Sequence, residues 1–356
     1  MPESPPSQTP APSPDHESTP GSFVHGEPEA GRWNRWFLVL VPLLLVVVVL
    51  DLVRIPYFVL SPGPAEDVLP LIHISGRTVY EPKGHLLLTS VYESRGRVTI
   101  YQALRAWIDP SQVVVPEREI LYPGQTTQQA VQVAQSQMDE SKFSAALLVV
   151  GRYAGYPKTH APGAFIVSVL AGTPAAGRLL AQDVITEVDG KVVADPDALG
   201  RLIQQGGPGT ALDLTVLRGG RTRRVAVTPA IPKGGNHLQI GVETVDNFPF
   251  RLSIDSEDIG GPSAGLMWAV GLVDLLTPGD LTGGRTIAGT GQIEPNGRVL
   301  PIGGVEEKVV AAERAGATIF FVPVDNAAAA RSVAHHITIV PVKTYQDAVT
   351  YLQRNP

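Results

Sequence analysis

The stretch Ile259 to Gly265 reads IGGPSAG and contains the pattern G-x-S-x-G around Ser263. This pattern is typical of a strained turn that presents a serine nucleophile at the start of a helix. The residues that follow, SAGLMWAVGLVDLL at 263–276, are largely apolar and predict a buried helix. Serine is also a favoured helix-capping residue, so its oxygen could simply satisfy an unpaired amide. The pattern therefore singles out Ser263 but leaves these two roles open.

A lysine on a second predicted helix is the candidate base for Ser263. Residues 305–316, VEEKVVAAERAG, predict a helix closed by glycine. No carboxylate lies three or four residues from Lys308 on this helix; the positions hold Gly304, Val305, Ala311 and Ala312. Burial among such residues would lower the pKa of Lys308 from about 10.4 toward roughly 7–8, as a general base requires. The alternative is a lysine whose stem covers the alanines while its amine reaches water.

A serine-histidine-aspartate triad is the rival arrangement. The chain order serine, acid, histidine is met by Ser263, Asp325 and either His335 or His336, as in α/β-hydrolases. Three features speak against it. The α/β-hydrolase fold needs strands before the nucleophile where this chain has a different module, Pro262 is awkward in a strained turn, and the histidine pair leads directly into the apolar strand ITIV. The sequence therefore favours Lys308.

The segment before Ser263 contains a separate module. Its motifs follow in the order GAFIVSVL (163–170), GTPAAG (172–177), DVITEVDGKVV (183–193), DPDALGRLIQQGG (195–207) and a hairpin at 212–230. They predict a strand, a turn, a hairpin at Asp-Gly, a capped helix and a terminal hairpin. This order resembles a bacterial PDZ domain over 149–230, which implies peptide recognition by strand addition. The peptide carboxylate is expected near Val150 to Gly155, and a module that only packs is the alternative.

Three blocks around the two candidate residues resemble the proteolytic domain of the Lon family. They are GGPSAG at Ser263, IAGTGQIEPNGRVLPIGG at 287–304 and VEEKVVAAERAG at Lys308. The resemblance implies a serine-lysine peptidase with Ser263 as nucleophile and Lys308 as base. It also implies that Thr290 hydrogen-bonds the lysine. Two departures concern the surroundings of this pair: Gly260 stands where many Lon domains carry aspartate, and Gln292 replaces a usual glutamate.

The amino-terminal part of the chain differs in composition from the rest. Residues 1–31 are rich in proline and poor in large apolar residues, so we expect a disordered arm. Residues 36–50, WFLVLVPLLLVVVVL, carry no charge, and we expect a transmembrane helix over 32–55. A cleaved signal peptide is the alternative, but no small-residue cleavage site follows. The distribution of arginines favours a cytoplasmic amino terminus at the cell membrane and a catalytic domain outside the cytoplasm.

Composition excludes several classes of function. The chain has 356 residues and a net charge of −6, which gives no basis for nucleic-acid binding. It contains no cysteine, which excludes disulfides, thiolate zinc sites and a cysteine nucleophile. The pattern G-x-x-x-x-G-K-[ST] does not occur, so we expect activity without ATP. The serine-lysine chemistry requires neither a metal nor another cofactor.

Taken together, the whole chain resembles the membrane-anchored PDZ-Lon peptidases of bacteria (YlbL-like). The expected fold is an α/β (α+β) Lon-type peptidase domain with an inserted PDZ domain, a β-rich, partly open barrel, and one N-terminal transmembrane helix. We expect the front part of the peptidase at 61–148 and the catalytic domain at 231–356. The expected partners are exported protein or peptide substrates, and the resemblance allows a homo-oligomer. The alternative function is a PDZ adaptor whose Lon-like domain is inactive.

Overall fold

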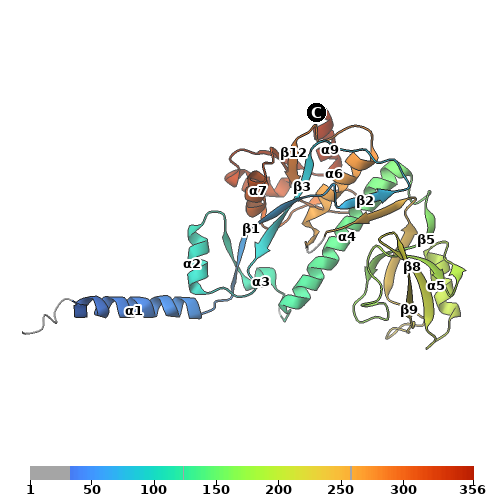
Figure 1. Cartoon of the computed structure of the whole chain (residues 1–356), viewed down its shortest axis with the longest axis horizontal. Coiled ribbons are helices and arrows are strands. Elements are labelled where there is room, and N and C mark those ends of the chain that lie inside the picture. The colour runs from blue at the N-terminus through green and yellow to red at the C-terminus, as the bar shows by residue number, and fades with distance from the viewer. Residues whose placement is uncertain (1–32, 123, 257–258) are drawn as a thin grey trace, which may run out of the picture. The chain divides into compact units, whose positions relative to one another are not determined.

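The computed structural model describes residues 33–122, 124–256 and 259–356 (Figure 1). The predicted disordered arm, 1–31, lies outside these residues. Contacts between residues divide the chain into two compact units, Met1–Leu50 and Asp51–Pro356. Helix α1 covers Trp33–Leu52. Within the described ranges, no helix combines the length and the apolar character needed to cross a membrane. The transmembrane helix expected over 32–55 is therefore not confirmed.

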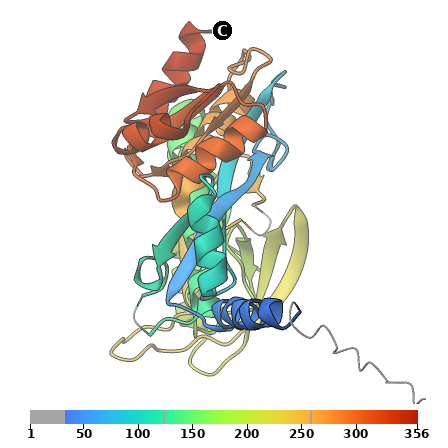
Figure 2. The ribbon, with the colours of Figure 1, turned by 90° about the vertical axis from the view of Figure 1, so that its left-hand side faces the viewer.

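A six-stranded mixed sheet is the framework of the larger unit. Its strands, in spatial order, are β16 (Thr338–Val342), β15 (Ile319–Pro323), β12 (Thr286–Gly289), β3 (His85–Glu93), β1 (Tyr57–Asp67) and β4 (Val113–Pro116). The four from β16 to β3 run parallel to one another, and β1 is antiparallel to both β3 and β4. Strands that lie about 200 residues apart in the sequence are thus direct neighbours, as the blue and orange-red elements in Figure 2 show.

Helices cover both faces of this sheet, because its central strands are apolar on both sides. Leu86, Leu88 and Phe321 belong to one core with α4 (Thr127–Ala154), α6 (Gly265–Leu276) and α9 (Tyr345–Arg354). Leu87 and Phe320 belong to another core with α7 (Val305–Arg314) and α8 (Ala327–Val333). Alternate residues of a strand point to opposite faces, so the runs LLL and IFFV place apolar side chains on both. Both runs form strands, His85–Glu93 and Ile319–Pro323.

A second sheet lies between α4 and α6 in the sequence. Its strands follow the order β10 (Val242–Asn247), β5 (Ala161–Val169), β6 (Val184–Val188), β8 (Leu212–Arg218) and β9 (Arg221–Val227), and the short β7 (Lys191–Val192) pairs with β6. Helix α5 (Pro196–Gln205) covers a separate apolar core of this sheet, and its cap Asp195 accepts a bond from Ala198 N at 2.6 Å. The hairpin turns predicted at Asp189-Gly190 and Gly219-Gly220 are present. The sheet also includes β10, which lies beyond residue 230, the end predicted for the PDZ domain. The domain limits expected from the sequence stay predictions.

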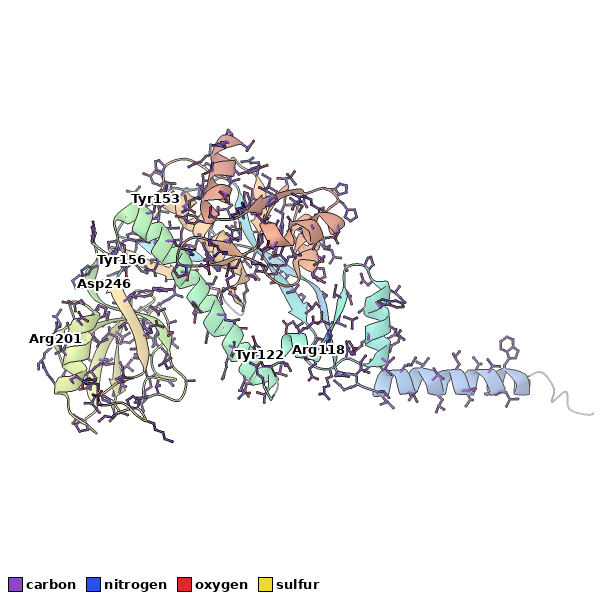
Figure 3. The ribbon with its side chains drawn as sticks, turned by 180° about the vertical axis from the view of Figure 1, so that it is seen from behind. Arg118, Tyr122, Tyr153, Tyr156, Arg201 and Asp246 are labelled. Atoms are coloured by element: carbon purple, nitrogen blue, oxygen red, sulfur yellow. The ribbon has the colours of Figure 1, made fainter. Side chains whose placement is uncertain are left out.

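Helix α4 contacts the second sheet and the start of α6. It packs against α6 and β5, and Phe143 on α4 stacks on Phe165 of β5 with ring centroids 6.1 Å apart. Just after α4, Tyr156 Oη donates a hydrogen bond of 2.9 Å to Asp246 O on β10; Figure 3 shows these two residues next to each other. Two small sheets complete the unit: β2 (Ile72–Ser75) with β11 (Arg251–Ile254), and β13 (Gln292–Ile293) with β14 (Val299–Leu300). The remaining helices are α2 (Ile100–Ile108) and α3 (Glu117–Ile120).

Candidate active site

Ser263 lies in a single 3₁₀ turn, Pro262–Ala264, that leads directly into α6. Gly261 precedes the turn with φ of 88°, a conformation that only glycine adopts at little cost. Pro262 suits the first position of the turn because its fixed φ is compatible with a helix and its missing N–H removes no bond. The carbonyl of Ser263 accepts a hydrogen bond of 2.7 Å from Gly291 N. Ser263 itself is half-buried, so its backbone is fixed while its side chain stays accessible.

Lys308 points from the first turn of α7 toward Ser263. Its Nζ lies 2.5 Å from Ser263 Oγ, and the lysine is only 3% exposed. Its neighbours Val305, Ala311 and Ala312 are buried as well, so the lysine lies inside the apolar stripe that the sequence predicts. Burial lowers the pKa of Lys308 to about 8, and the charge of Glu307 acts in the opposite direction. At pH 7 about one tenth of the Lys308 amine is therefore neutral, far more than in an ordinary surface lysine.

Thr290 joins the lysine to the serine backbone. It follows β12 directly and is completely buried. Lys308 Nζ donates to Thr290 Oγ1 at 3.3 Å, and Thr290 Oγ1 donates in turn to Ser263 O at 3.1 Å. A neutral amine has two N–H groups and one lone pair. Because Thr290 takes one of the N–H groups, the lone pair can be directed at Ser263 Oγ. All three residues expected at the site are thus brought together.

An open cavity of about 300 Å³ adjoins the serine and the lysine. Its apolar lining includes Leu88 and Val91 of β3, Met138 of α4 and Ile259. Glu66 of β1 and Glu93 of β3 add carboxylates to the lining. The cavity gives Ser263 Oγ access to a chain segment of a few residues. Among the described residues, no group of three or more histidine, aspartate and glutamate side chains is arranged to hold a metal ion.

The two histidines of the rival triad lie elsewhere. The backbone amides of His335 and His336 both donate to Glu313 Oε1, at 2.6 and 2.7 Å, at the C-terminal end of α7. Lys308 is in the first turn of the same helix. Within the part of the chain that the structure describes, neither histidine lines the cavity at Ser263. The triad Ser263, Asp325 and His335 or His336 is therefore not assembled.

Two features near the site could not be predicted from the sequence. Glu307 is 2% exposed, and its Oε1 has no hydrogen-bond partner among the described residues. Burial raises the pKa of Glu307, whereas on sequence grounds it reads as one of two ordinary helix carboxylates. Gly260 lies against α4, where a Cβ would be 3.0 Å from Ala134 Cβ. This close approach gives a physical reason for glycine where many Lon domains carry aspartate. No local pattern in the sequence indicates the burial of Glu307 or the close approach of Gly260 to α4.

Comparison with known families agrees with this geometry. Residues 257–353 match the family model of the Lon protease (S16) C-terminal proteolytic domain. Residues 137–228 match that of the PDZ domain. The chain contains a Lon proteolytic domain and a PDZ domain. The Lon match covers Ser263, Thr290 and Lys308, and the PDZ match covers β5 to β9 with α5.

Several relatives carry the name Lon protease. Lon protease 2 of Bacillus subtilis (strain 168) is 37% identical over 110 residues, which are 31% of this chain and 19% of that protein. Lon protease of Phenylobacterium zucineum (strain HLK1) is 30% identical over 200 residues, 54% of this chain and 22% of that protein. The chain thus spans about one fifth of the length of these two relatives. The similarity supports a serine peptidase domain in this chain.

Solved structures of PDZ domains are similar to part of this chain. The PDZ domain of the SdrC-like protein from Listeria innocua is 29% identical and covers 23% of this chain and 92% of that one, with a TM-score of 0.22. The corresponding domain from Listeria monocytogenes is 28% identical and covers 23% of this chain and 87% of that one, also with a TM-score of 0.22.

Proposed function

We propose that this chain is a serine endopeptidase in which Ser263 is the nucleophile, Lys308 the general base and Thr290 a supporting residue. The observation that carries the proposal is the distance of 2.5 Å between Lys308 Nζ and Ser263 Oγ, at the edge of an open cavity. A protonated amine cannot accept a proton, and burial lowers the pKa of Lys308 to about 8. The amine is therefore available as a base at neutral to mildly alkaline pH.

In the first half of the reaction, the lone pair of Lys308 takes the proton of Ser263 as Oγ attacks a peptide carbonyl carbon. The carbonyl oxygen gains a negative charge in the tetrahedral intermediate. Amides of the first helical turn at Ser263 are the candidate donors for this oxyanion, and the start of α6 adds a positive dipole. Loss of one such donor costs roughly 3–4 kcal/mol in comparable sites.

In the second half, the ammonium of Lys308 gives its proton to the leaving amine, and the carbon–nitrogen bond breaks. The acyl group stays on Ser263 Oγ as an ester. The neutral lysine then takes a proton from a water molecule whose oxygen attacks the ester carbonyl carbon. The resulting ammonium returns this proton to Ser263 Oγ as the ester carbon–oxygen bond breaks, and the acid product leaves. Thr290 keeps the amine directed at Oγ in both halves, because it accepts one of the lysine N–H groups at 3.3 Å.

The PDZ domain suggests that substrates are proteins or peptides, selected or admitted through this domain. The 356 residues contain no P-loop motif, so we propose that cleavage proceeds without ATP. A cell-membrane location, exported substrates and a homo-oligomeric state stay predictions from the sequence. Protease protection and detergent extraction of cells that express the full chain would test the location.

Purified wild-type chain, Ser263→Ala and Lys308→Ala would test the proposal with an unfolded protein and a mixture of short fluorogenic peptides. We expect both variants to lose about 10³-fold or more of kcat/KM, because members of one catalytic unit fail together. Thr290→Val should lose less than either, and Thr290→Ser, which keeps the hydroxyl, should retain most of the activity.

A double variant, His335→Ala with His336→Ala, is the matched control for the rival triad. We expect it to cleave at the wild-type rate, since both histidines lie at Glu313 and away from the cavity. Loss of cleavage in this control, with Lys308→Ala still active, would remove the lysine from the mechanism. Identical behaviour of wild type and Ser263→Ala on every substrate would favour the adaptor alternative.

A further inference from the structure

Gln182 of the PDZ domain has an unusual backbone conformation. It lies just before β6 with φ of 69°. Among the described residues, the other non-glycine residue with positive φ is Asp189. This region of backbone conformations costs a residue with a Cβ about 1 kcal/mol or more. The N–H of Gln182 donates to Ile166 O at 2.8 Å, which holds the turn in place.

The side chain of Gln182 leaves the PDZ domain and binds the peptidase backbone. Its Nε2 donates to Ile254 O at 3.0 Å, and its Oε1 accepts from Ile254 N at 2.8 Å. One amide thus satisfies both main-chain groups of a residue that is 4% exposed, as a neighbouring strand would. Ile254 is the last residue of β11, and Ser263 follows nine residues later.

Three residues between Ile254 and Ser263 are also held by hydrogen bonds to α4. Positions 134, 141 and 142 lie on one face of this helix because seven or eight residues make two turns. The three bonds are Gly261 N to Ala134 O at 2.7 Å, Ser141 Oγ to Pro262 O at 3.0 Å and Lys142 Nζ to Ser256 Oγ at 3.0 Å. The described residues of the segment that carries the nucleophile are therefore bonded to the PDZ domain at Ile254 and to α4 at Ser256, Gly261 and Pro262.

The segment that ends at Ser263 is also connected to the PDZ sheet through the main chain. β10 is the edge strand of that sheet, and four residues after Asn247 the chain enters β11. A movement of the PDZ sheet would therefore act on Ile254 through two connections, the covalent chain from β10 and the side chain of Gln182. Both lead to the segment that ends at Ser263.

We propose that Gln182 is a positioning residue through which the PDZ domain controls the placement of Ser263. The inference rests on the proposed peptidase function for its catalytic readout. It assigns the PDZ domain a regulatory role on the rate of the chemical step, in addition to any capture of substrate. Loss of the Gln182 contact is expected to lower kcat more than it raises KM, because most of the cavity lining belongs to β1, β3 and α4 and lies outside the segment that ends at Ser263.

Gln182→Gly separates this role from a general effect on folding. Glycine adopts φ of 69° without steric cost, so the turn is preserved while the side-chain amide is removed. Asp189→Gly is the matched control: Asp189 has φ of 48°, lies in the same domain and uses its Oδ1 to accept from Asp213 N at 2.8 Å, on strand β8 of the same sheet. Both variants introduce a glycine at positive φ and remove side-chain hydrogen bonds, but only the two bonds of Gln182 reach β11.

Both variants would be compared in the full chain, by peptide cleavage and by hydrogen exchange at the amide of Gly261. This amide bonds to Ala134 O on the α4 side and not to Gln182 itself. We expect Gln182→Gly to lower kcat about 10- to 100-fold and to accelerate exchange at Gly261, with Asp189→Gly at the wild-type value in both. Unchanged kcat and unchanged exchange in Gln182→Gly would overturn the proposal. Absence of cleavage in the wild type would refute the peptidase function alone, since the exchange at Gly261 still decides the role of Gln182.

Discussion

The amine of Lys308 is placed where water cannot stabilise its positive charge. Its pKa is about 8 in the folded chain and about 10.5 in the unfolded one. Below pH 8 both states hold the proton, so the folded state carries the full cost of a buried charge. As the pH rises from 8 toward 10.5, the folded state loses the proton first and the stability contributed by this site increases. The same titration produces the base that the proposed reaction needs.

The first prediction concerns the pH dependence of cleavage. Because the neutral amine is the base, kcat/KM should rise about tenfold per pH unit below pH 8 and level off above it. Initial rates with one fluorogenic peptide between pH 5.5 and 9.5 would measure this curve. A half-maximal point near 6.5, the usual pKa of an imidazole, would instead indicate a histidine base.

The second prediction concerns Glu307, whose charge raises the pKa of Lys308 against the effect of burial. Glu307→Gln removes this charge at almost constant size, so the pH–rate curve should move to lower pH by roughly half a unit. Glu306→Gln is the control on the same helix, because the charge of Glu306 acts on Glu307 rather than on Lys308. Equal shifts in the two variants would show that no specific interaction with Glu307 exists.

At the scale of single residues, sequence reasoning reaches Ser263, Thr290 and Lys308 because each belongs to a short motif. It also anticipates the apolar stripe around Lys308, since helical spacing is a local property. The burial of Glu307 and of Lys142 is not local. Lys142 is 6% exposed and pairs with Asp139 at 2.7 Å and with Ser256 at 3.0 Å, more than 100 residues away. Such pairs become visible only when the chain is folded.

At the scale of the elements, the packing of α6 against α4 requires a close contact at the start of α6. A Cβ at Gly265 would lie 2.7 Å from both Ser141 Oγ and Ile293 Cγ2. The third prediction is that Gly265→Ala separates these elements, costs roughly 1–3 kcal/mol of stability and slows the reaction of Ser263 with a fluorophosphonate. Hydrogen exchange of the α6 amides and the labelling rate would measure the two effects.

Gly200 in α5 provides the matched control for Gly265→Ala. No atom lies within 4 Å of a Cβ built at this position, which is inside a helix. Gly200→Ala should therefore stabilise α5 by about 1 kcal/mol and leave the labelling of Ser263 unchanged. If both alanines had the same effect on α6, the close contact at Gly265 would not be what the helix requires.

The edge strand β10 shows where element prediction from the sequence fails. Its residues, VETVDN, alternate only weakly between apolar and polar, and five of the six are half-buried. An edge strand that contacts a helix at one side and solvent at the other gives a weak periodic signal. The strands β3 and β15, in contrast, are continuous apolar runs, as is typical of strands that are buried on both faces.

At the scale of the whole unit Asp51–Pro356, the main sheet takes strands from both sides of the PDZ domain. Leu87 pairs with Ala288 across the parallel contact of β3 and β12. The family resemblance suggests a front part of the peptidase before the PDZ domain, but no periodicity in the sequence specifies which strand β3 joins. Pairing between strands that are distant in the sequence depends on tertiary packing, so the sequence alone does not predict the register between β3 and β12.

The fourth prediction concerns the state of the substrate. Without a P-loop motif in its 356 residues, the chain has no recognised means of using ATP to unfold a protein. Cleavage should then depend on the fraction of substrate that is already unfolded, which is small for a domain stable by about 5–15 kcal/mol. An unfolded protein should be cut at the same rate with and without ATP and Mg²⁺. A stable folded domain should be cut slowly in both cases, and about tenfold faster for every 1.4 kcal/mol by which a mutation destabilises it.

Gel-based degradation of one substrate domain and two destabilised variants, with Ser263→Ala as the blank, would measure this relation. Faster cleavage of the stable domain on addition of ATP would contradict the proposed independence from ATP, whereas a rate that ignores substrate stability would show that the cavity accepts folded surface loops.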